Sequence, residues 1–381
     1  MNINGKHYRT IWPNQAGNGV WIIDQTTLPH RFELVELRDV GDVVRAIATM
    51  QVRGATLIGG AGAYGLALAL QDDPSNDGLA EAYRRLLTTR PTAVNLRWAL
   101  DLVRSAVLAL PPAERGERAF CLAGKICDDD VATSQAIAEH GWQLLRACWM
   151  DKGMPDRLNV LTHCNAGWLA TIDWGTALAP IYLAHDHGMP IHVWVDETRP
   201  RNQGASLTAF ELGCHGVAHT VIADNVGGHL MQQGMVDLCI VGTDRTTAAG
   251  DVCNKIGTYL KALAAWDNAV PFYVALPHSS IDWTMQDGVG RIAIERRDPA
   301  ELSQITGRTA DGRIETVNIL PEHSAAANWA FDVTPARYIT ALITERGVCP
   351  ASRAGLAALY GAAPASTFVV GSERHALRTQ Q

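Results

Sequence analysis

Short apolar runs recur through the second half of the chain, and segments with helical spacing separate them. The runs are four or five residues long and cover 159–162, 191–195, 220–223, 238–241 and 272–276. The helix-like segments between them cover 168–187, 206–215, 227–233 and 253–265. Fully buried strands are apolar throughout, and parallel strands need crossover helices. The alternation therefore predicts an α/β fold with a Rossmann-like, doubly wound parallel sheet.

The first part of the chain follows another pattern. Three short strand-like runs, broken by turn-forming residues, predict a small antiparallel sheet, and helical spacing then continues to about residue 151. The strand-like runs cover 7–12, 20–25 and 32–37. An Asp-Lys-Gly-Met-Pro segment at 151–155 follows and is typical of a domain boundary. We expect a smaller N-terminal domain of helices with a short antiparallel sheet (1–150) and a Rossmann-like catalytic domain (151–381).

The last part of the chain gives weaker signals. A Phe-Asp-Val-Thr-Pro segment at 331–335 precedes a helix-like run at 336–344. The polar end of the chain, 372–381, is expected to fray.

Polar or reactive residues follow each predicted strand of the main sheet. They are His-Cys-Asn at 163–165, Asp-Glu-Thr-Arg at 196–199, Asp-Asn at 224–225, Thr-Asp-Arg at 243–245 and Pro-His-Ser at 277–279. Loops are polar in any protein, but open α/β sheets bind ligands beyond the carboxyl ends of their strands. Five such ends, one with a cysteine, therefore favour a functional site at this edge.

Three cations stand where helices are expected to begin. Asn254-Lys255 follows the small-residue loop after the strand at 238–241, and Arg53-Gly54-Ala55-Thr56 precedes a helical segment. Arg90 stands in a Thr-Arg-Pro-Thr segment that we expect to open another helix, with the proline in its first turn. Helix N-termini favour phosphate, so an anion site is one interpretation. An ordinary surface ion pair or helix cap is the other.

Two features that suggest a cofactor are weak. Residues 60–65 match G-x-G-x-x-G, but no strand precedes them, so we interpret them as a close-packed buried helix rather than a dinucleotide loop. None of the eight cysteines has a paired zinc spacing, and most are expected to be buried, reduced thiols. The sequence therefore predicts no metal and no cofactor.

Charge and hydropathy narrow the class of partner. The 381 residues are 47% hydrophobic and 19% charged, with a net charge of −7 and no block of like charges. This argues against nucleic acid or an acidic membrane as a partner. No secretory signal or apolar stretch of membrane-spanning length is present, so we expect a cytoplasmic protein with no membrane contact.

Phosphate-binding cations beside one cysteine and one aspartate suggest acid–base work on a small phosphorylated substrate. A helix N-terminus after Cys164 would lower the pKa of its thiol, and apolar surroundings would raise the pKa of the Asp244 carboxyl. The spacing of these residues leaves the reaction itself open.

Several segments resemble methylthioribose-1-phosphate isomerases. They are Leu-Thr-His-Cys-Asn-Ala-Gly at 161–167, Asp-Glu-Thr-Arg-Pro at 196–200 with Gln-Gly-Ala at 203–205, Ile-Ala-Asp-Asn at 222–225, Gly-Thr-Asp-Arg at 242–245, Asn-Lys-Ile-Gly-Thr-Tyr at 254–259 and 331–335. Arg-Gly-Ala at 53–55 and Arg-Pro-Thr-Ala-Val-Asn-Leu at 90–96 match the N-terminal motifs of the family. The wider family also holds regulatory subunits of a translation initiation factor exchange complex, which share the fold but act by binding.

The resemblance implies conversion of 5-methylthio-D-ribose 1-phosphate to 5-methylthio-D-ribulose 1-phosphate in methionine salvage, by a homodimer. It implies catalytic roles for Cys164 and Asp244. Its substrate contacts fall on Arg53, Gly54, Ala55, Arg90, Gln203, Asn254 and Lys255. The hydrogen moves between C1 and C2 by an enolate or a hydride route, and Cys164 is then a base or a stabiliser of the transition state.

The sequence departs from the family pattern at some positions. Thr56 stands where proline is usual in the family. The other residues that differ from the family pattern are Trp168, Trp174, Thr243 and Cys253. These positions bear on the shape of the pocket and hence on the 5-substituent. An isomerase of 5-deoxyribose 1-phosphate or ribose 1,5-bisphosphate, and a non-enzymatic binding subunit, remain the alternatives. A NAD-dependent redox enzyme would rest on residues 60–65 alone.

Overall fold

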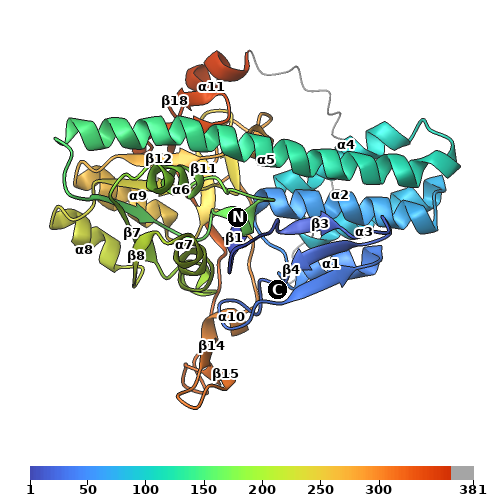
Figure 1. Cartoon of the computed structure of the whole chain (residues 1–381), viewed down its shortest axis with the longest axis horizontal. Coiled ribbons are helices and arrows are strands. Elements are labelled where there is room, and N and C mark those ends of the chain that lie inside the picture. The colour runs from blue at the N-terminus through green and yellow to red at the C-terminus, as the bar shows by residue number, and fades with distance from the viewer. Residues whose placement is uncertain (362–381) are drawn as a thin grey trace, which may run out of the picture.

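The computed structural model describes residues 1–361, and the end expected to fray, 372–381, lies outside them. The first part of the chain forms two small antiparallel sheets and five helices (Figure 1). The strands are β1 (Asn2–Ile3), β2 (Lys6–His7), β3 (Ile11–Pro13), β4 (Val20–Ile23) and β5 (Leu34–Leu37). The helices are α1 (Val40–Ala48), α2 (Ala55–Asp72), α3 (Asn76–Thr89), α4 (Val94–Val107) and α5 (Pro112–Asp151).

Helix α2 is the centre of this part, and nearly all of its residues are buried. A Cβ atom at Gly62 would lie 2.4 Å from Leu96 of α4, and one at Gly65 would lie 2.8 Å from Val43 of α1. Glycine therefore allows the neighbouring helices to pack closely against α2. The interpretation of residues 60–65 as a close-packed helix is confirmed. Helix α5 packs on α2 and continues over α6 (Ala179–Asp186), as Figure 1 shows.

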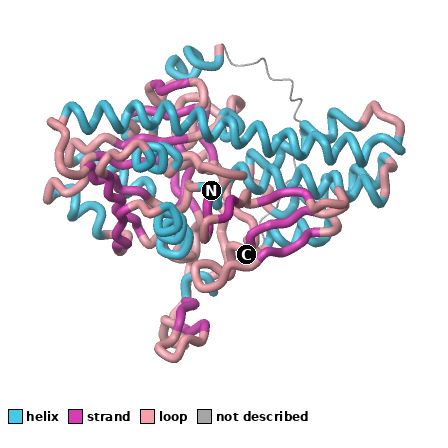
Figure 2. Tube along the Cα trace, viewed as in Figure 1, coloured by secondary structure: helices cyan, strands magenta, loops and turns pink. Residues whose placement is uncertain are grey.

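The main sheet has seven strands in the order β18-β17-β12-β9-β6-β7-β8, and every neighbouring pair is parallel except β17 and β18. The strands are β6 (Leu158–Thr162), β7 (Ile191–Asp196), β8 (Ala218–Ile222), β9 (Leu238–Val241), β12 (Phe272–Ala275), β17 (Ala341–Thr344) and β18 (Gly347–Cys349). The helices beside it are α6, α7 (Ala209–His215), α8 (Val226–Gln232), α9 (Thr258–Asp267) and α11 (Arg353–Tyr360) (Figure 2). The predicted α/β fold with a parallel sheet is confirmed.

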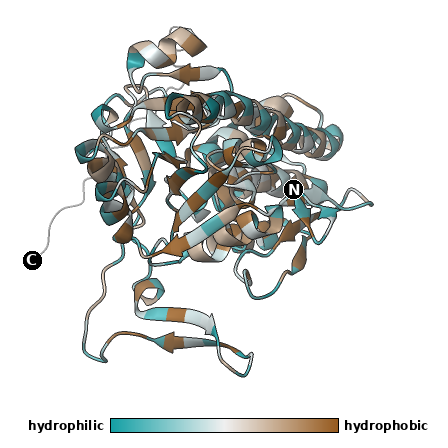
Figure 3. Cartoon of the chain, turned by 60° about the vertical axis from the view of Figure 1, so that its left-hand side comes forward, coloured by the Kyte–Doolittle hydropathy of each residue, from teal (hydrophilic) through white to brown (hydrophobic). Residues whose placement is uncertain are grey.

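A second sheet has the order β13-β10-β11-β16, and its strand β10 follows β9 in the chain. Its strands are β10 (Arg245–Thr247), β11 (Val252–Lys255), β13 (Ile281–Asp282) and β16 (Phe331–Thr334). The short helix α10 (Ala300–Ser303) leads into a hairpin of β14 (Gln304–Arg308) and β15 (Ile314–Asn318), which projects from the body (Figure 3). No helix among residues 1–361 is long and apolar enough to cross a membrane.

Four local predictions are wrong. Asn254 and Lys255 belong to strand β11, and the helix begins only at Thr258, because β11 pairs with β10 and β16. Residues 336–344 form a 3-10 turn and then strand β17, which pairs with β12. Residues 168–187 form a 3-10 turn and then α6 after a loop. Arg90 follows α3, and α4 begins at Val94, so Pro91 lies in the connecting turn.

Candidate active site

Cys164 and Asp244 lie beyond the ends of two neighbouring strands. Strands β6 and β9 pair in parallel, with Leu161 opposite Cys239, so their carboxyl ends meet at one edge of the sheet. Both residues line one cavity. Four more of the predicted contacts line it as well: Arg53, Gly54, Ala55 and Asn254. The structure therefore brings together residues that are far apart in sequence.

The backbone of Cys164 is held on both sides in a left-handed conformation, with φ of 67°. Its N–H donates to Oγ1 of Thr198 at 2.8 Å, and its carbonyl accepts from Oγ1 of Thr208 at 2.7 Å. Burial raises the pKa of the thiol, although Arg53 and Lys255 oppose that shift. The expected lowering of this pKa is wrong, because the next element is a 3-10 turn at Trp168–Ala170 and supplies no α-helix N-terminus.

Asp244 is half-buried between β9 and β10. Its N–H donates to the carbonyl of Cys253 at 3.0 Å, which fixes the backbone against β11. Burial raises the pKa of the carboxyl, and Lys255, Arg90 and Arg53 oppose the shift. The predicted direction is confirmed, and the carboxyl binds a proton more readily than it would in water.

The N-terminus of α2 faces the same cavity. Gly54 has φ of 98°, and a Cβ atom there would lie 2.3 Å from the carbonyl oxygen of Ala170, so only glycine fits. The guanidinium of Arg53 donates to the side-chain oxygen of Asn165 and, at 3.0 Å, to its carbonyl oxygen. Free N–H groups at a helix start and a fixed cation suit an anionic ligand.

Asn165 is in turn held by Glu211, a residue that the sequence analysis did not single out. Asn165 Nδ2 donates to Glu211 Oε1 at 2.8 Å, and the carboxylate also accepts from Tyr182 Oη and from the N–H groups of Trp168 and Leu169. Burial raises the pKa of Glu211 to about 7, and these hydrogen bonds oppose the shift. One signal was available: Glu211 is the only acidic residue in the helix-like segment 206–215.

Arg90 and Lys255 complete the predicted cations. Arg90 forms an ion pair with Glu295 at 3.0 Å and lines a cavity that Gly54, Ala55 and Asp244 also line. The buried Lys255 ammonium lies 4.8 Å from the ring centroid of Phe331, and no carboxylate of residues 1–361 forms an ion pair with it. Burial lowers the pKa of Lys255, while Cys164 and Asp244 oppose that change.

One of the amides predicted to bind substrate lines the cavity, and the other contacts the thiol. Asn254 lines the cavity and donates to Oγ1 of Thr258 at 3.0 Å. Gln203 approaches Cys164 from a neighbouring cavity that Arg53 also lines. Two protonatable groups, cations and amides in one buried site are suited to proton transfer on a small anionic molecule.

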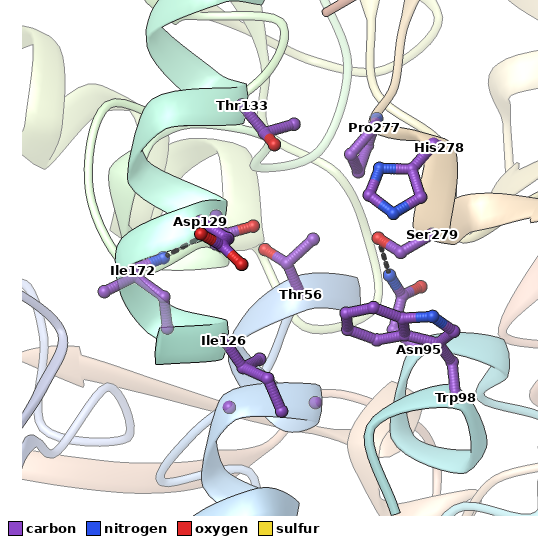
Figure 4. Close-up of a pocket in the computed structure, with 13 residues that line it drawn as sticks. Thr56, Asn95, Trp98, Ile126, Asp129, Thr133, Ile172, Pro277, His278 and Ser279 are labelled. Carbon is purple, nitrogen blue, oxygen red and sulfur yellow. Dashed lines mark hydrogen bonds between the residues drawn. The ribbon is translucent and has the colours of Figure 1, made fainter. Parts of the chain in front are cut away.

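Another cavity adjoins the site and shares Thr56 and Pro277 with it (Figure 4). In this cavity Asn95 points toward Ser279 and donates to its Oγ at 2.8 Å. Trp98, Ile126 and Ile172 form apolar parts of its wall. Thr56, one of the departures from the family pattern, thus stands between the two cavities.

Comparisons with known proteins agree with this geometry. The sequence profile of the initiation factor 2 subunit family matches residues 51–351. The methylthioribose-1-phosphate isomerase of Rhodospirillum rubrum is 64% identical over 364 residues, which cover 94% of this chain and 93% of the relative. The crystal structure of 5-methylthioribose 1-phosphate isomerase from Pyrococcus horikoshii OT3 matches with a TM-score of 0.79 and 39% identity, over 93% of this chain and 96% of that chain.

A solved structure of a translation initiation factor subunit is also similar. The translation initiation factor eIF-2B, subunit delta, from A. fulgidus matches with a TM-score of 0.74 and 38% identity, over 93% of this chain and 99% of that chain. The resemblance expected from the motifs is thus confirmed by a family profile and by relatives that cover nearly the whole chain. The chain belongs to the initiation factor 2 subunit family and, within it, to the methylthioribose-1-phosphate isomerases.

Proposed function

We propose that this chain converts 5-methylthio-D-ribose 1-phosphate to 5-methylthio-D-ribulose 1-phosphate in methionine salvage. The observation that carries the proposal is that Cys164 and Asp244 line one cavity with the cationic start of α2. The names of the most similar relatives support the same reaction. A binding subunit has no need of a thiol and a carboxyl together beside an anion site.

The phosphate binds at the N-terminus of α2 in this proposal. Arg53 and the backbone N–H groups at Gly54 and Ala55 surround one side of it, and Lys255 neutralises charge from the other. Arg90, held by Glu295, adds positive charge beside Asp244. Asn254 and Gln203 orient the hydroxyl groups of the sugar. Charge-assisted contacts in a buried site are stronger than in water.

The reaction begins with opening of the sugar ring. Because phosphate occupies the anomeric oxygen, the ring cannot open as a free hemiacetal does, and an acid must protonate the ring oxygen as its bond to C1 breaks. Asp244, whose carboxyl pKa is raised by burial, delivers this proton. The hydrogen on C2 then moves to C1, and the C2 hydroxyl returns a proton to Asp244. The product is the open-chain ketose with its phosphate still on C1.

Cys164 contacts the reacting carbons in this scheme. Burial raises the pKa of its thiol, so the neutral form predominates in the resting site. A neutral thiol cannot remove a proton from carbon, and Cys164 therefore acts by stabilising the transition state of the hydrogen transfer. Gln203, which accepts from the thiol at 3.6 Å, keeps it oriented.

The proposal also covers the domain organisation, the oligomeric state and the cellular location of the protein. Residues 1–150 and 151–381 act as two domains with the site between them, since α2 and the ends of β6 and β9 supply its walls. The active form is a homodimer, as the family resemblance implies. The protein works in the cytoplasm on a small metabolite, without a metal or cofactor.

An isomerase assay tests the proposal directly. The purified protein is treated with a chelator and desalted. It is then incubated separately with 5-methylthioribose 1-phosphate, 5-deoxyribose 1-phosphate and ribose 1,5-bisphosphate, and NMR follows the formation of each ketose product. Turnover of the methylthio compound with the highest kcat/KM is the expected result. A preference for another 5-substituent would favour the related isomerases. Absence of all turnover would favour a binding subunit, and restoration by a divalent ion or NAD would overturn the cofactor-free reaction.

A further inference from the structure

The ring of His163, the residue before Cys164, is enclosed between two chain segments. Its side chain is fully buried. Nδ1 lies 2.8 Å from Oδ2 of Asp196 at the end of β7, and Nε2 lies 2.8 Å from the carbonyl oxygen of Ile256, which follows Lys255. The ring therefore has one oxygen partner on each side.

The partners determine where the ring carries hydrogen. A backbone carbonyl can only accept, so Nε2 of His163 carries a hydrogen. Oδ2 of Asp196 also faces the ammonium of Lys261 at 3.1 Å, and an ammonium can only donate. Oδ2 of Asp196 therefore accepts from Lys261 and lies against Nδ1 of the ring. His163 thus donates from Nε2 to the segment that follows Lys255.

The same cluster has the residue types of a metal site, because ligand atoms of His163, Asp196 and Asp224 lie within 4.8 Å of one another. Lys261, however, donates to Oδ2 of Asp196 and to the carbonyl oxygen of Asp224. The carboxylate of Asp224 accepts the N–H groups of Thr198 and Arg199 at 2.7 Å each. The cation of this cluster is thus a lysine of the chain itself, and the cluster serves to hold the strand ends.

The bond to Ile256 fixes the segment that carries Lys255. Gly257 has φ of 101°, and a Cβ atom there would lie 3.0 Å from Cε1 of His163, so glycine lets the chain turn against the ring. We propose that His163 is a positioning residue that sets the place of the Lys255 ammonium relative to Cys164. The inference rests on the proposed function, because it takes Lys255 as a phosphate contact.

Two substitutions by amide residues test the two hydrogen bonds of the His163 ring one at a time. The amide of His163→Asn reaches the place of Nδ1 and keeps the bond to Asp196, whereas that of His163→Gln reaches the place of Nε2 and keeps the bond to Ile256. We expect His163→Asn to raise the Kd for inorganic phosphate and the KM about tenfold, with a smaller change in kcat. His163→Gln should restore most of that affinity. Equal affinities in the two variants, or a loss of thermal stability alone, would overturn the proposal.

Lys255→Ala serves as the reference for phosphate binding. If it leaves the affinity unchanged, the anion site of the proposed function is wrong; if it weakens binding and His163→Asn does not, the positioning role is wrong. Neutron diffraction from wild-type crystals adds a test that needs no variant. Deuterium on Nε2 of His163 is expected, and a ring without deuterium on Nε2 would contradict the proposal even if the variants failed to fold.

Discussion

The thiol of Cys164 donates to the side-chain oxygen of Gln203, with Sγ 3.6 Å from Oε1. Gln203 precedes the π-helical turn Gly204–Thr208, and this turn lies against the end of β7, where a Cβ atom at Gly204 would be 1.7 Å from the carbonyl oxygen of Asp196. The loop after one strand therefore orients the reactive group of its neighbour. Burial raises the pKa of this thiol, and in the contact with Gln203 the neutral thiol donates.

Substitution of the two candidate catalytic groups should separate binding from turnover. Cys164→Ser and Asp244→Asn nearly preserve size, so we expect both variants to fold and to bind substrate. Each should lower kcat by about a hundredfold or more, because a positioned acid typically contributes that much. Circular dichroism and calorimetry check folding and binding beside the assay. Near-normal turnover by a folded Asp244→Asn variant would refute the acid assignment, since only the titrating proton is removed.

Removal of a phosphate-binding cation should weaken ligand binding. We expect Arg53→Ala and Lys255→Ala to cost about 2 kcal/mol or more in the binding of substrate or product, because both side chains are buried. Arg84→Ala, which removes an exposed arginine paired with Glu81, is the matched control and should change nothing. Calorimetric titration measures all three. If the buried variants bind as well as Arg84→Ala does, the phosphate lies elsewhere.

The backbone at Gly54 offers a test of the α2 start. Gly54 and Gly153 both have positive φ, but a Cβ atom at Gly54 meets the carbonyl oxygen of Ala170 at 2.3 Å, and one at Gly153 meets nothing within 4 Å. Gly54→Ala should lower the free energy of unfolding by about 3 kcal/mol or more. Gly153→Ala should show only the backbone strain, about 1 kcal/mol. Urea unfolding compares the pair, and equal losses would mean that the close approach is absent.

The fate of the C2 hydrogen distinguishes the two routes left open by the sequence. Burial raises the pKa of the Cys164 thiol and of the Asp244 carboxyl, so neither group is readily present as a base for a carbon-bound proton. Direct transfer from C2 to C1 is therefore expected. Product formed in D₂O should carry no deuterium on C1 at early times, as read by NMR. Full incorporation of solvent deuterium would establish the enolate route instead.

Glu211 should make stability depend on pH. Burial raises its pKa from 4.5 to about 7, so the folded state keeps a proton that the unfolded state loses. The contribution of this proton to the free energy of unfolding is fully present below about pH 4.5. It decreases as the pH rises toward 7, and above that it no longer changes with pH. Relative to Glu211→Gln, which does not titrate, the wild type should lose up to about 3 kcal/mol across this window.

Urea unfolding of both proteins at several pH values between 4 and 8 gives this difference. Glu211→Gln should itself be less stable, because its amide NH₂ would face N–H donors that now find a carboxylate oxygen. A difference between the two proteins that stays constant with pH would contradict the raised pKa.

The sequence by itself determined the elements whose pattern is local. The five apolar runs became strands β6, β7, β8, β9 and β12 of the parallel sheet, and residues 60–65 became part of the buried helix α2. The start of α2 after Gly54 was likewise predictable. Parallel strands joined by crossover helices also predicted that the residues after β6 and β9 share one edge of the sheet, and Cys164 and Asp244 do lie there together.

Only the tertiary structure decided what surrounds those residues. Asn254 and Lys255 lie in a strand because β11 pairs with β16, some eighty residues away in sequence, and no local pattern contains that partner. The direction of the Cys164 pKa shift depends on burial, and the Arg90–Glu295 pair and the donors around Glu211 depend on segments that meet only in the folded chain. Desolvation and hydrogen bonding act over a few ångströms in space, whatever the separation along the sequence.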